Sequence, residues 1–200
     1  MYPLLETIRF ENGSFSNIDY HIRRMKNAVE TCLKKRLTFD PEKILKDIAA
    51  NNKTRRGLYK FRFLYDFDQY DREFVPYRLP SIKTLNPVWT DDIDYSCKWT
   101  DRTRLQALAE QKGEAGDVLI IKNGLVTDTS FANLVFFDGN RWLTPETPLL
   151  KGTQRAFLLD QGLIEEQRIT YEDLDRFEEI RIINAMIRLE DQLSVVVLKR

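Results

Sequence analysis

The sequence predicts an α+β fold, and three features of its 200 residues support that class. Apolar residues recur at helical spacing in the first half of the chain. In the second half, apolar strand-like segments meet at Asn-Gly or Asp-Gly turns. Helical segments are spread among these hairpins instead of alternating regularly with strands. This order favours α+β over a wound parallel sheet, and the length allows two small domains with packed cores.

The first half reads as a strand, two helices and a second strand. Residues 4–10, "LLETIRF", predict a strand that ends at the Asn-Gly of a tight hairpin. Residues 16–36 have the pattern of an amphipathic helix, and a second helix is predicted after Pro41. Residues 57–68 alternate as a half-buried strand does. The apolar face of the first helix comprises Ile18, His21, Ile22, Met25, Ala28, Val29 and Cys32.

The middle of the chain contains the predicted domain boundary. Residues 77–94 are rich in proline, threonine and aspartate, which indicates a strand and a linker. We therefore expect a smaller N-terminal domain over residues 1–86 and a C-terminal domain over residues 87–200.

The C-terminal domain is predicted to be rich in hairpins. A helix is expected near residues 101–112, and hairpins over 117–128 and 133–145. Residues 150–162 indicate a loop, a helix and a glycine stop. The final strands are expected within 178–186 and 193–200.

Composition excludes several classes of function. Lysine plus arginine and aspartate plus glutamate number 31 each, so no net field attracts nucleic acid or anionic membrane. No apolar run reaches bilayer length, and charges at Glu6 and Arg9 argue against a signal peptide. A single histidine excludes a multi-histidine metal site. Cys32 and Cys97 are far apart without a CxxC pair, which favours reduced thiols and a cytoplasmic location.

Four short segments are candidates for chemistry, and each also has an ordinary structural explanation. Lys98 stands between apolar neighbours just before a predicted helix, where a surface lysine near a turn is the alternative. Gly152 enters a helix and leaves backbone N–H groups to meet an anion, although a glycine before a helix is commonplace. Arg24 lies near the apolar helix face and could meet a carboxylate or a phosphate, whereas Arg23 reads as solvated. Asp128 and Asn133 flank a turn that also suits both residue types.

The order of these segments resembles the class IV, or fold type IV, pyridoxal-phosphate enzymes. The family contains branched-chain and D-amino-acid aminotransferases and aminodeoxychorismate lyase. "TDTSFANLVFF" and "LLKGTQRAFLL" match in the right order after Lys98, and "ETIRFENGSFSNIDYHIRRM" matches the Glu-Thr strand and His-x-x-Arg helix. "KWTDR" is similar to the lyase branch, in which Arg102 stands where aminotransferases tend to carry tyrosine. The resemblance implies the two-domain fold of that family with a shortened N-terminus, and a homodimer.

The resemblance assigns a role to each matching residue. Lys98 would bind pyridoxal 5'-phosphate covalently, because a neutral primary amine condenses with its aldehyde and an apolar setting favours the neutral form. Asp128, with Asn133 beside it, would face the pyridine nitrogen in place of the usual family glutamate. The phosphate would be bound by Arg24, by the turn at Gly152, Thr153 and Gln154, and by a second turn at Ala185 and Met186. His21 is interpreted as a satisfied, half-buried histidine.

The implied activity is that of a lyase that converts 4-amino-4-deoxychorismate to 4-aminobenzoate and pyruvate in folate synthesis. A D- or branched-chain aminotransferase shares every cofactor contact and is the alternative. A non-catalytic PLP-binding protein is the second alternative. Arg62 and Arg102 are candidates for binding the substrate carboxylates.

Overall fold

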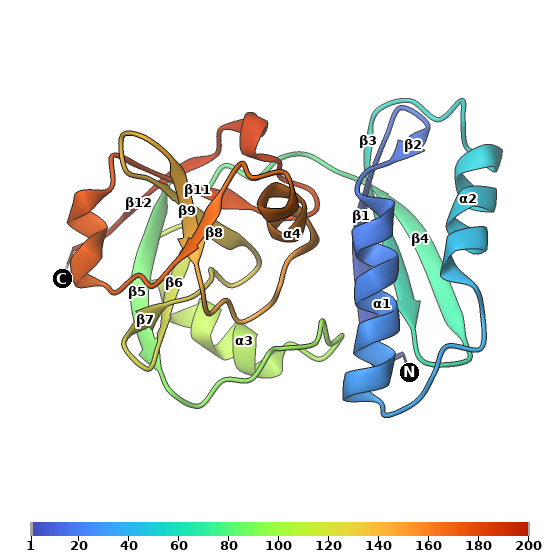
Figure 1. Cartoon of the computed structure of the whole chain (residues 1–200), viewed down its shortest axis with the longest axis horizontal. Coiled ribbons are helices and arrows are strands. Elements are labelled where there is room, and N and C mark those ends of the chain that lie inside the picture. The colour runs from blue at the N-terminus through green and yellow to red at the C-terminus, as the bar shows by residue number, and fades with distance from the viewer. Residues whose placement is uncertain (1, 200) are drawn as a thin grey trace. The chain divides into compact units, whose positions relative to one another are not determined.

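A computed structural model describes residues 2–199, and the chain divides into two compact units. Unit 1 consists of Met1–Leu79 and Cys97–Asp101, and unit 2 consists of Pro80–Ser96 and Arg102–Arg200. Helices and strands are present in both units (Figure 1). The class is α+β, as the sequence predicts.

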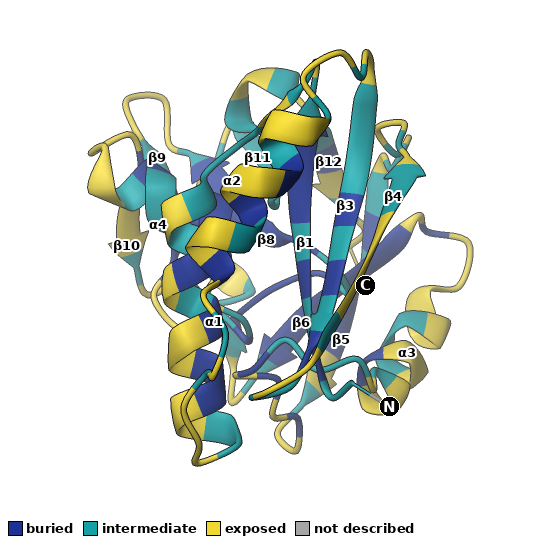
Figure 2. Ribbon diagram, turned by 90° about the vertical axis from the view of Figure 1, so that its right-hand side faces the viewer, coloured by how far each residue is buried: buried dark blue, intermediate teal, exposed yellow. Residues whose placement is uncertain are grey.

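Unit 1 is a four-stranded antiparallel sheet in the order β2-β1-β3-β4, with two helices on one of its faces (Figures 1 and 2). The tight β1–β2 turn suits its residues, since Asn12 and Gly13 both have positive φ, 49° and 93°. Pro41 occupies the first turn of α2, which Asp40 caps by accepting from two backbone N–H groups. The elements are β1 Leu4–Glu11, β2 Ser14–Phe15, α1 Ile18–Cys32, α2 Pro41–Asn51, β3 Leu58–Tyr65 and β4 Tyr70–Pro76.

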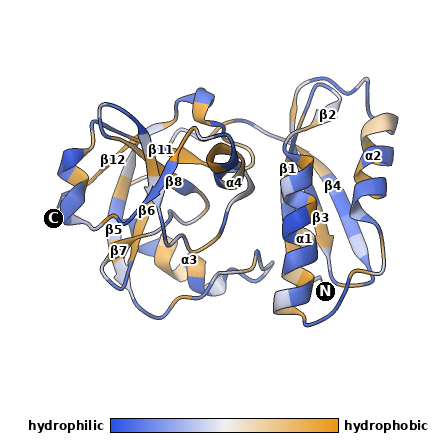
Figure 3. Ribbon diagram, in the orientation of Figure 1, coloured by the Kyte–Doolittle hydropathy of each residue, from blue (hydrophilic) through white to orange (hydrophobic). Residues whose placement is uncertain are grey.

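The core of unit 1 lies between this sheet and its helices. Alternate residues of β1 face inward, so Glu6 is buried in the same row as Leu4 and Ile8. The predicted face of α1 is buried from His21 to Val29, while Ile18 and Cys32 at its two ends are only partly covered (Figure 2). Hydropathy follows the same division, with hydrophilic residues on the outer side of both helices (Figure 3).

Unit 2 is built on an eight-stranded mixed sheet in the order β10-β9-β8-β11-β12-β5-β6-β7. Three neighbouring pairs are parallel, namely β5–β6, β12–β5 and β10–β9. α4 packs through Leu158 against Val135 and Ile183 of the sheet. The strands are β5 Thr84–Thr90, β6 Asp117–Lys122, β7 Leu125–Val126, β8 Asn133–Phe137, β9 Trp142–Pro145, β10 Glu165–Gln167, β11 Glu179–Ile183 and β12 Ser194–Val197. The helices are α3 Thr103–Ala109 and α4 Thr153–Asp160, with 3-10 turns at Glu110–Lys112, Glu172–Arg176 and Leu189–Asp191.

The structure divides the chain at a different place from the boundary expected after residue 86. Residues 80–86 belong to unit 2, because β5 begins at Thr84 and pairs with strands of that unit. The lysine segment Cys97–Asp101, expected in the C-terminal domain, belongs instead to unit 1. Both differences from the expected boundary depend on backbone pairing between residues far apart in the sequence. Residue composition does not indicate such pairing.

The expectation of reduced thiols is contradicted. Cys32 at the end of α1 and Cys97 are joined by a disulfide across 65 residues of sequence, with their Cα atoms 6.7 Å apart. The strand β4 and the short strand β10 were also not anticipated, and the helix expected near 101 begins at Thr103. Within residues 2–199 no helix is long and apolar enough to cross a membrane.

Candidate active site

The most deeply buried ionic group of unit 1 is a trio of Glu6, His21 and Arg24. Glu6 on β1 is fully buried, and it accepts from Nε and Nη2 of Arg24 at 2.8 and 2.5 Å. His21 Nδ1 lies 2.6 Å from Oε2 of Glu6, the oxygen that also accepts from Nη2 of Arg24. One turn of α1 separates His21 from Arg24, so both side chains reach the same carboxylate. The fork of Arg24 points inward, as the sequence allowed, and the group that it meets here is a carboxylate.

The charges of this trio follow from its contacts. Burial alone would raise the pKa of Glu6, but the Arg24 charge, with hydrogen bonds from Arg24 and His21, lowers it to about 2. Burial lowers the pKa of His21, and the positive charges of Arg24 and Lys98 act in the same direction. At neutral pH Glu6 is therefore ionised and His21 is neutral. Because the carboxylate can only accept, the proton of His21 resides on Nδ1.

Lys98 lies in a short segment held against the start of β1. Leu5 N donates to the carbonyl oxygen of Lys98 at 3.0 Å, and Thr100 N donates to Pro3 O at 2.8 Å. Lys98 is half-buried, and the neighbouring Cys97 is 5% exposed. The segment therefore places the lysine beside the strand that carries Glu6, and its charge acts on His21.

Unit 2 contains a second buried carboxylate, Asp128, in a network of neutral donors. Asn133 Nδ2 donates to Oδ1 of Asp128 at 2.8 Å and also to the Leu150 carbonyl at 2.9 Å. The backbone N–H of Leu150 donates to Oδ2 of Asp128 at 2.9 Å. The network therefore joins the turn between β7 and β8 to the loop before α4. The sequence grouped Asp128 and Asn133, and the structure shows how they are connected.

Asp128 has the opposite electrostatic character to Glu6. Burial raises the pKa of Asp128 to about 6, although hydrogen bonds from Leu150 and Asn133 and the charge of Arg155 oppose the rise. A carboxyl group with that pKa is ionised at pH 7 but takes up a proton in mildly acidic solution. Such a perturbed group is typical of functional sites, and structural networks also produce it.

Gly152, the residue before α4, is required by close packing. A Cβ atom at this position would lie 2.0 Å from Oδ1 of Asn133, so only glycine leaves that amide in place. Thr153 and Gln154 follow in the first turn of α4, and both are buried. A helix N-terminus of this kind favours an anion. Gly152, which we expect at the phosphate site, therefore also allows Asn133 to keep its position beside Asp128.

Arg155, in the same turn, was not among the predicted residues. It is 3% exposed and donates to the Pro145 carbonyl and to Glu166 on β10 at 2.8 and 2.7 Å. Its charge helps to keep Asp128 ionised. Its position three residues after Gly152, in "GTQR", is the sequence feature that could have identified it.

The remaining predicted residues have different surroundings. Ala185 and Met186 form a turn in which Met186 N donates to the Asn184 side chain at 2.8 Å. Arg62 on β3 pairs with Glu73, its cross-strand partner on β4, and both are exposed. Arg102 donates to the Ser130 carbonyl at 2.6 Å, and its buried Nε has no hydrogen-bond partner among the described residues. Of the two arginines expected to bind substrate carboxylates, Arg62 thus pairs with a carboxylate of the protein, whereas Arg102 donates to a backbone carbonyl.

Glu6 is a fully buried residue to which the sequence patterns assigned no role. The signal was present, because alternation from Leu4 to Ile8 places Glu6 on the inward face of the strand. A buried glutamate requires a partner, and His21 and Arg24 are that partner.

Across residues 2–199, no group of three or more His, Cys, Asp or Glu residues could hold a metal ion.

Comparison with known proteins identifies the family of this chain. The amino-transferase class IV family matches residues 3–189, so the chain belongs to that family. Its enzymes are PLP-dependent, and the chain is accordingly a lyase or an aminotransferase of this class.

Individual relatives support the same assignment. An uncharacterized protein of Haemophilus influenzae is 39% identical over 188 residues, which are 93% of this chain and 98% of the relative. A crystal structure from Haemophilus somnus, named as a putative 4-amino-4-deoxychorismate lyase, is 43% identical with a TM-score of 0.88. That match covers 94% of this chain and 98% of the other. A Mesorhizobium loti structure, named as a putative amino-acid aminotransferase, shares the fold at 22% identity, with a TM-score of 0.82 and coverage of 99% and 100%.

Proposed function

We propose that this protein is a PLP-dependent lyase that converts 4-amino-4-deoxychorismate to 4-aminobenzoate and pyruvate, a step of folate synthesis. The observation that supports the reaction is the 43% identity, over almost the full length of both chains, to the protein named as a putative lyase of this kind. The residues of this chain fit the cofactor, because they offer a half-buried amine, an arginine, a helix N-terminus and a buried carboxyl group.

Each group has one task in this proposal. Lys98 holds the aldehyde carbon of the cofactor and later moves the proton from the amine-bearing carbon of the substrate. Asp128 keeps a proton on the pyridine nitrogen, and Asn133 holds its carboxylate in place. Arg24 and the backbone N–H groups of Thr153 and Gln154 bind the phosphate. Bound pyridoxal phosphate supplies an electron-withdrawing ring that stabilises negative charge on the substrate carbon.

Glu6 sets how Arg24 meets the phosphate. Because Glu6 accepts from Nε and Nη2, it fixes the orientation of the Arg24 guanidinium that binds the phosphate in this proposal. The turn at Ala185 and Met186 is retained as a second phosphate contact, and Arg102 as the first candidate for a substrate carboxylate, with Arg62 second.

The overall reaction requires no second substrate. The substrate loses the proton from its amine-bearing carbon, and the C–O bond to the enolpyruvyl group breaks. Pyruvate leaves, and the ring becomes aromatic as 4-aminobenzoate. An aminotransferase instead needs an α-keto acid to restore the cofactor, so the two reactions are distinguishable with purified protein.

The test combines a covalent trap with product analysis. After incubation with pyridoxal phosphate and borohydride reduction, mass spectrometry should find a pyridoxyl group on Lys98 and none in Lys98→Ala. Aminodeoxychorismate alone should then yield equimolar pyruvate and 4-aminobenzoate. Rapid, keto-acid-dependent turnover of D-alanine or branched-chain amino acids without an aromatic product would establish the aminotransferase. An adduct at Lys98 without turnover of any substrate would indicate a non-catalytic PLP-binding protein.

Two further features belong to this proposal. We expect a homodimer, which sedimentation of the holoenzyme can establish. We also expect a cytoplasmic location, which cell fractionation can establish.

A further inference from the structure

The two cysteines of the chain are bonded at a position that concerns the lysine. Cys32 is the last residue of α1, and Cys97 immediately precedes Lys98. α1 also carries His21 and Arg24. The disulfide therefore joins, by a covalent bond within unit 1, the helix of the proposed phosphate ligand to the segment of the proposed cofactor lysine.

Non-covalent contacts at the start of β1 also hold this segment. Leu5 N donates to the Lys98 carbonyl, Thr100 donates through its N–H and its Oγ1 to the Pro3 carbonyl, and Trp99 packs against the apolar core. A segment held by non-covalent contacts alone opens more readily than one that is also cross-linked. Removal of the disulfide should thus loosen Lys98 without unfolding the sheet.

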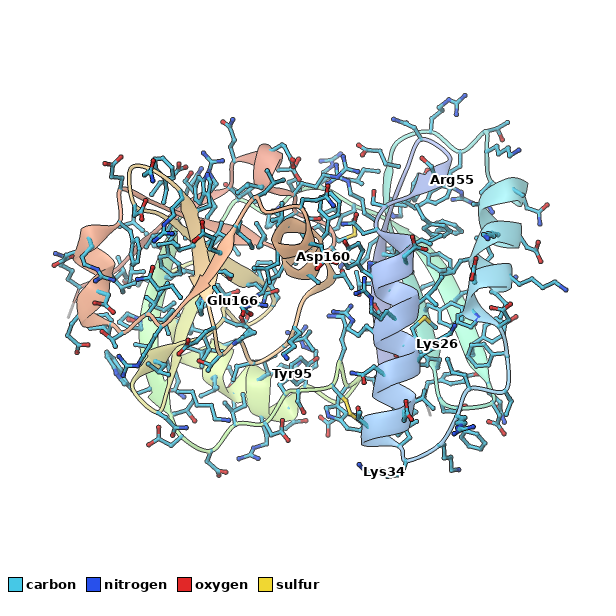
Figure 4. The ribbon with its side chains drawn as sticks, in the orientation of Figure 1. Lys26, Lys34, Arg55, Tyr95, Asp160 and Glu166 are labelled. Atoms are coloured by element: carbon cyan, nitrogen blue, oxygen red, sulfur yellow. A yellow bond between two sulfur atoms is a disulfide. The ribbon has the colours of Figure 1, made fainter. Side chains whose placement is uncertain are left out.

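The surroundings of the two sulfur atoms differ in a way that suits reversible exchange. Cys97 is 5% exposed within the apolar core, whereas Cys32 is only partly covered at the helix end. Lys34, Lys35 and Arg36 follow Cys32 and are exposed, and Lys34 lies just beyond α1 in Figure 4. Exposed positive charge attracts an anionic attacking thiolate, and Cys32 is the more accessible sulfur that such a thiolate reaches.

We propose that Cys32–Cys97 is a reversible thiol–disulfide site that a dithiol reductant opens at Cys32, and that its state controls how firmly Lys98 is held. This inference rests on the proposed function for the role of Lys98. A thiolate of the reductant attacks Sγ of Cys32, the S–S bond breaks, and Cys97 leaves as a thiolate that takes up a proton. The second thiol of the reductant then releases Cys32. The protein gains two electrons and two protons, and the reductant becomes a disulfide.

The proposed location gives this site its meaning. Disulfides in the cytoplasm are rare, and those that occur are usually transient or redox-sensing. A permanent structural bond would be expected in an oxidising compartment instead. Given the cytoplasmic location proposed above, we interpret a bond next to the proposed cofactor lysine as one that opens and closes.

The first part of the test establishes the bond and its reversibility. Full-length protein isolated without reductant is denatured and alkylated, and mass spectrometry counts the thiols. We expect none before and two after treatment with a dithiol, with closure on exposure to the oxidised dithiol. Two alkylated cysteines in the untreated protein would overturn the proposal.

The second part measures the consequence for the lysine segment. Amide hydrogen exchange is compared in oxidised protein, reduced protein, Cys32→Ser and the control Glu30→Gln, an exposed position of the same helix turn. We expect the amides of Leu5, Trp99 and Thr100 to exchange at least tenfold faster in the reduced protein and in Cys32→Ser. Glu30→Gln should behave as the oxidised protein. Equal exchange in both redox states would show that the bond does not hold the lysine segment.

The third part keeps this inference separate from the proposed function. After removal of the reductant, the rate of pyridoxylation at Lys98 should differ at least threefold between the two states. Equal rates in both states overturn the redox proposal and leave the role of Lys98 intact. If no adduct forms in either state, the role of Lys98 fails, and with it the claim that the redox state acts on the cofactor lysine.

Discussion

Glu6 in unit 1 and Asp128 in unit 2 are both buried carboxylates, yet their pKa values move in opposite directions, to about 2 and about 6. Burial disfavours ionisation of both. The difference lies in the partners, because Glu6 contacts the full positive charge of Arg24, whereas Asp128 contacts the amide of Asn133 and a backbone N–H. Hydrogen bonds from neutral donors offset only part of the rise in pKa that burial causes. A contacting cation lowers the pKa by more than burial raises it.

The contrast suits two different tasks. A permanently ionised Glu6 can act only as an acceptor, so it is suited to holding Arg24 and His21 in place. Asp128 ionises near neutral pH and can share a proton with a ring nitrogen. Its desolvated setting strengthens that interaction relative to water.

The largest effect is expected from removing the charge of Glu6. Glu6→Gln leaves Arg24 partly buried without its counter-charge, which should lower the free energy of unfolding by about 3–5 kcal/mol. Urea unfolding at pH 7 measures this. Glu73→Gln breaks the exposed pair with Arg62 and serves as the control, with an expected loss of about 0–1 kcal/mol. Similar losses in both variants would show that burial does not distinguish the two pairs.

The pH dependence of stability should separate the two acids. Glu6 has a lowered pKa, so its contribution is present above pH 4.5 and is lost as the pH falls through about 2. Asp128 has a raised pKa, so its contribution is present below pH 3.8 and is lost as the pH rises through about 6. Each amounts to about 3 kcal/mol.

Unfolding in urea from pH 2 to pH 7 tests both signs. Asp128→Asn should remove the decline between about pH 4 and pH 6, and Glu6→Gln should remove the loss of stability below pH 4.5. A wild-type profile that Asp128→Asn leaves unchanged would mean that the carboxyl group titrates at its ordinary pKa.

A smaller effect is expected at Gly152. In Gly152→Ala the new methyl group displaces the amide of Asn133, so the variant should lose about 1–3 kcal/mol of stability. Gly116→Ala is the comparison variant, because its Cβ would meet Cγ2 of the stiff, β-branched Ile82 at 2.9 Å, and Asn133→Ala should recover none of its loss. If the clash is the cause, Asn133→Ala should recover part of the Gly152→Ala loss in the double variant. Additive losses, measured by thermal unfolding, would place the cause elsewhere.

The smallest effect is expected for cofactor affinity. Arg24→Lys keeps a charge beside Glu6 but cannot present a fork, so pyridoxal phosphate should bind about 1–2 kcal/mol more weakly. Arg23→Lys, an exposed position over the Tyr20 ring, should bind normally. Titration with pyridoxal, which lacks the phosphate, provides the control. An equal penalty for both ligands would show that Arg24 does not contact the phosphate.

Sequence patterns predicted much of the fold because they report local conformation. The helical spacing from Ile18 to Cys32, the Asn-Gly turn after β1 and the glycine after α4 all lie within a few residues of their structural positions. The strand β4 was missed because its residues are mostly exposed and carry weak alternation. Patterns also brought Asp128 together with Asn133, since a short turn connects them.

The sequence by itself determined the family, the identity of the chemical groups and which faces are buried, because those properties reside in residue type and local periodicity. Only the tertiary structure decided that Glu6 holds Arg24, that Gly152 abuts Asn133, and that Cys32 meets Cys97. It also assigned the Lys98 segment to unit 1. These are contacts between residues that lie 18 or more positions apart, and they form because burial brings partners together that no local pattern connects.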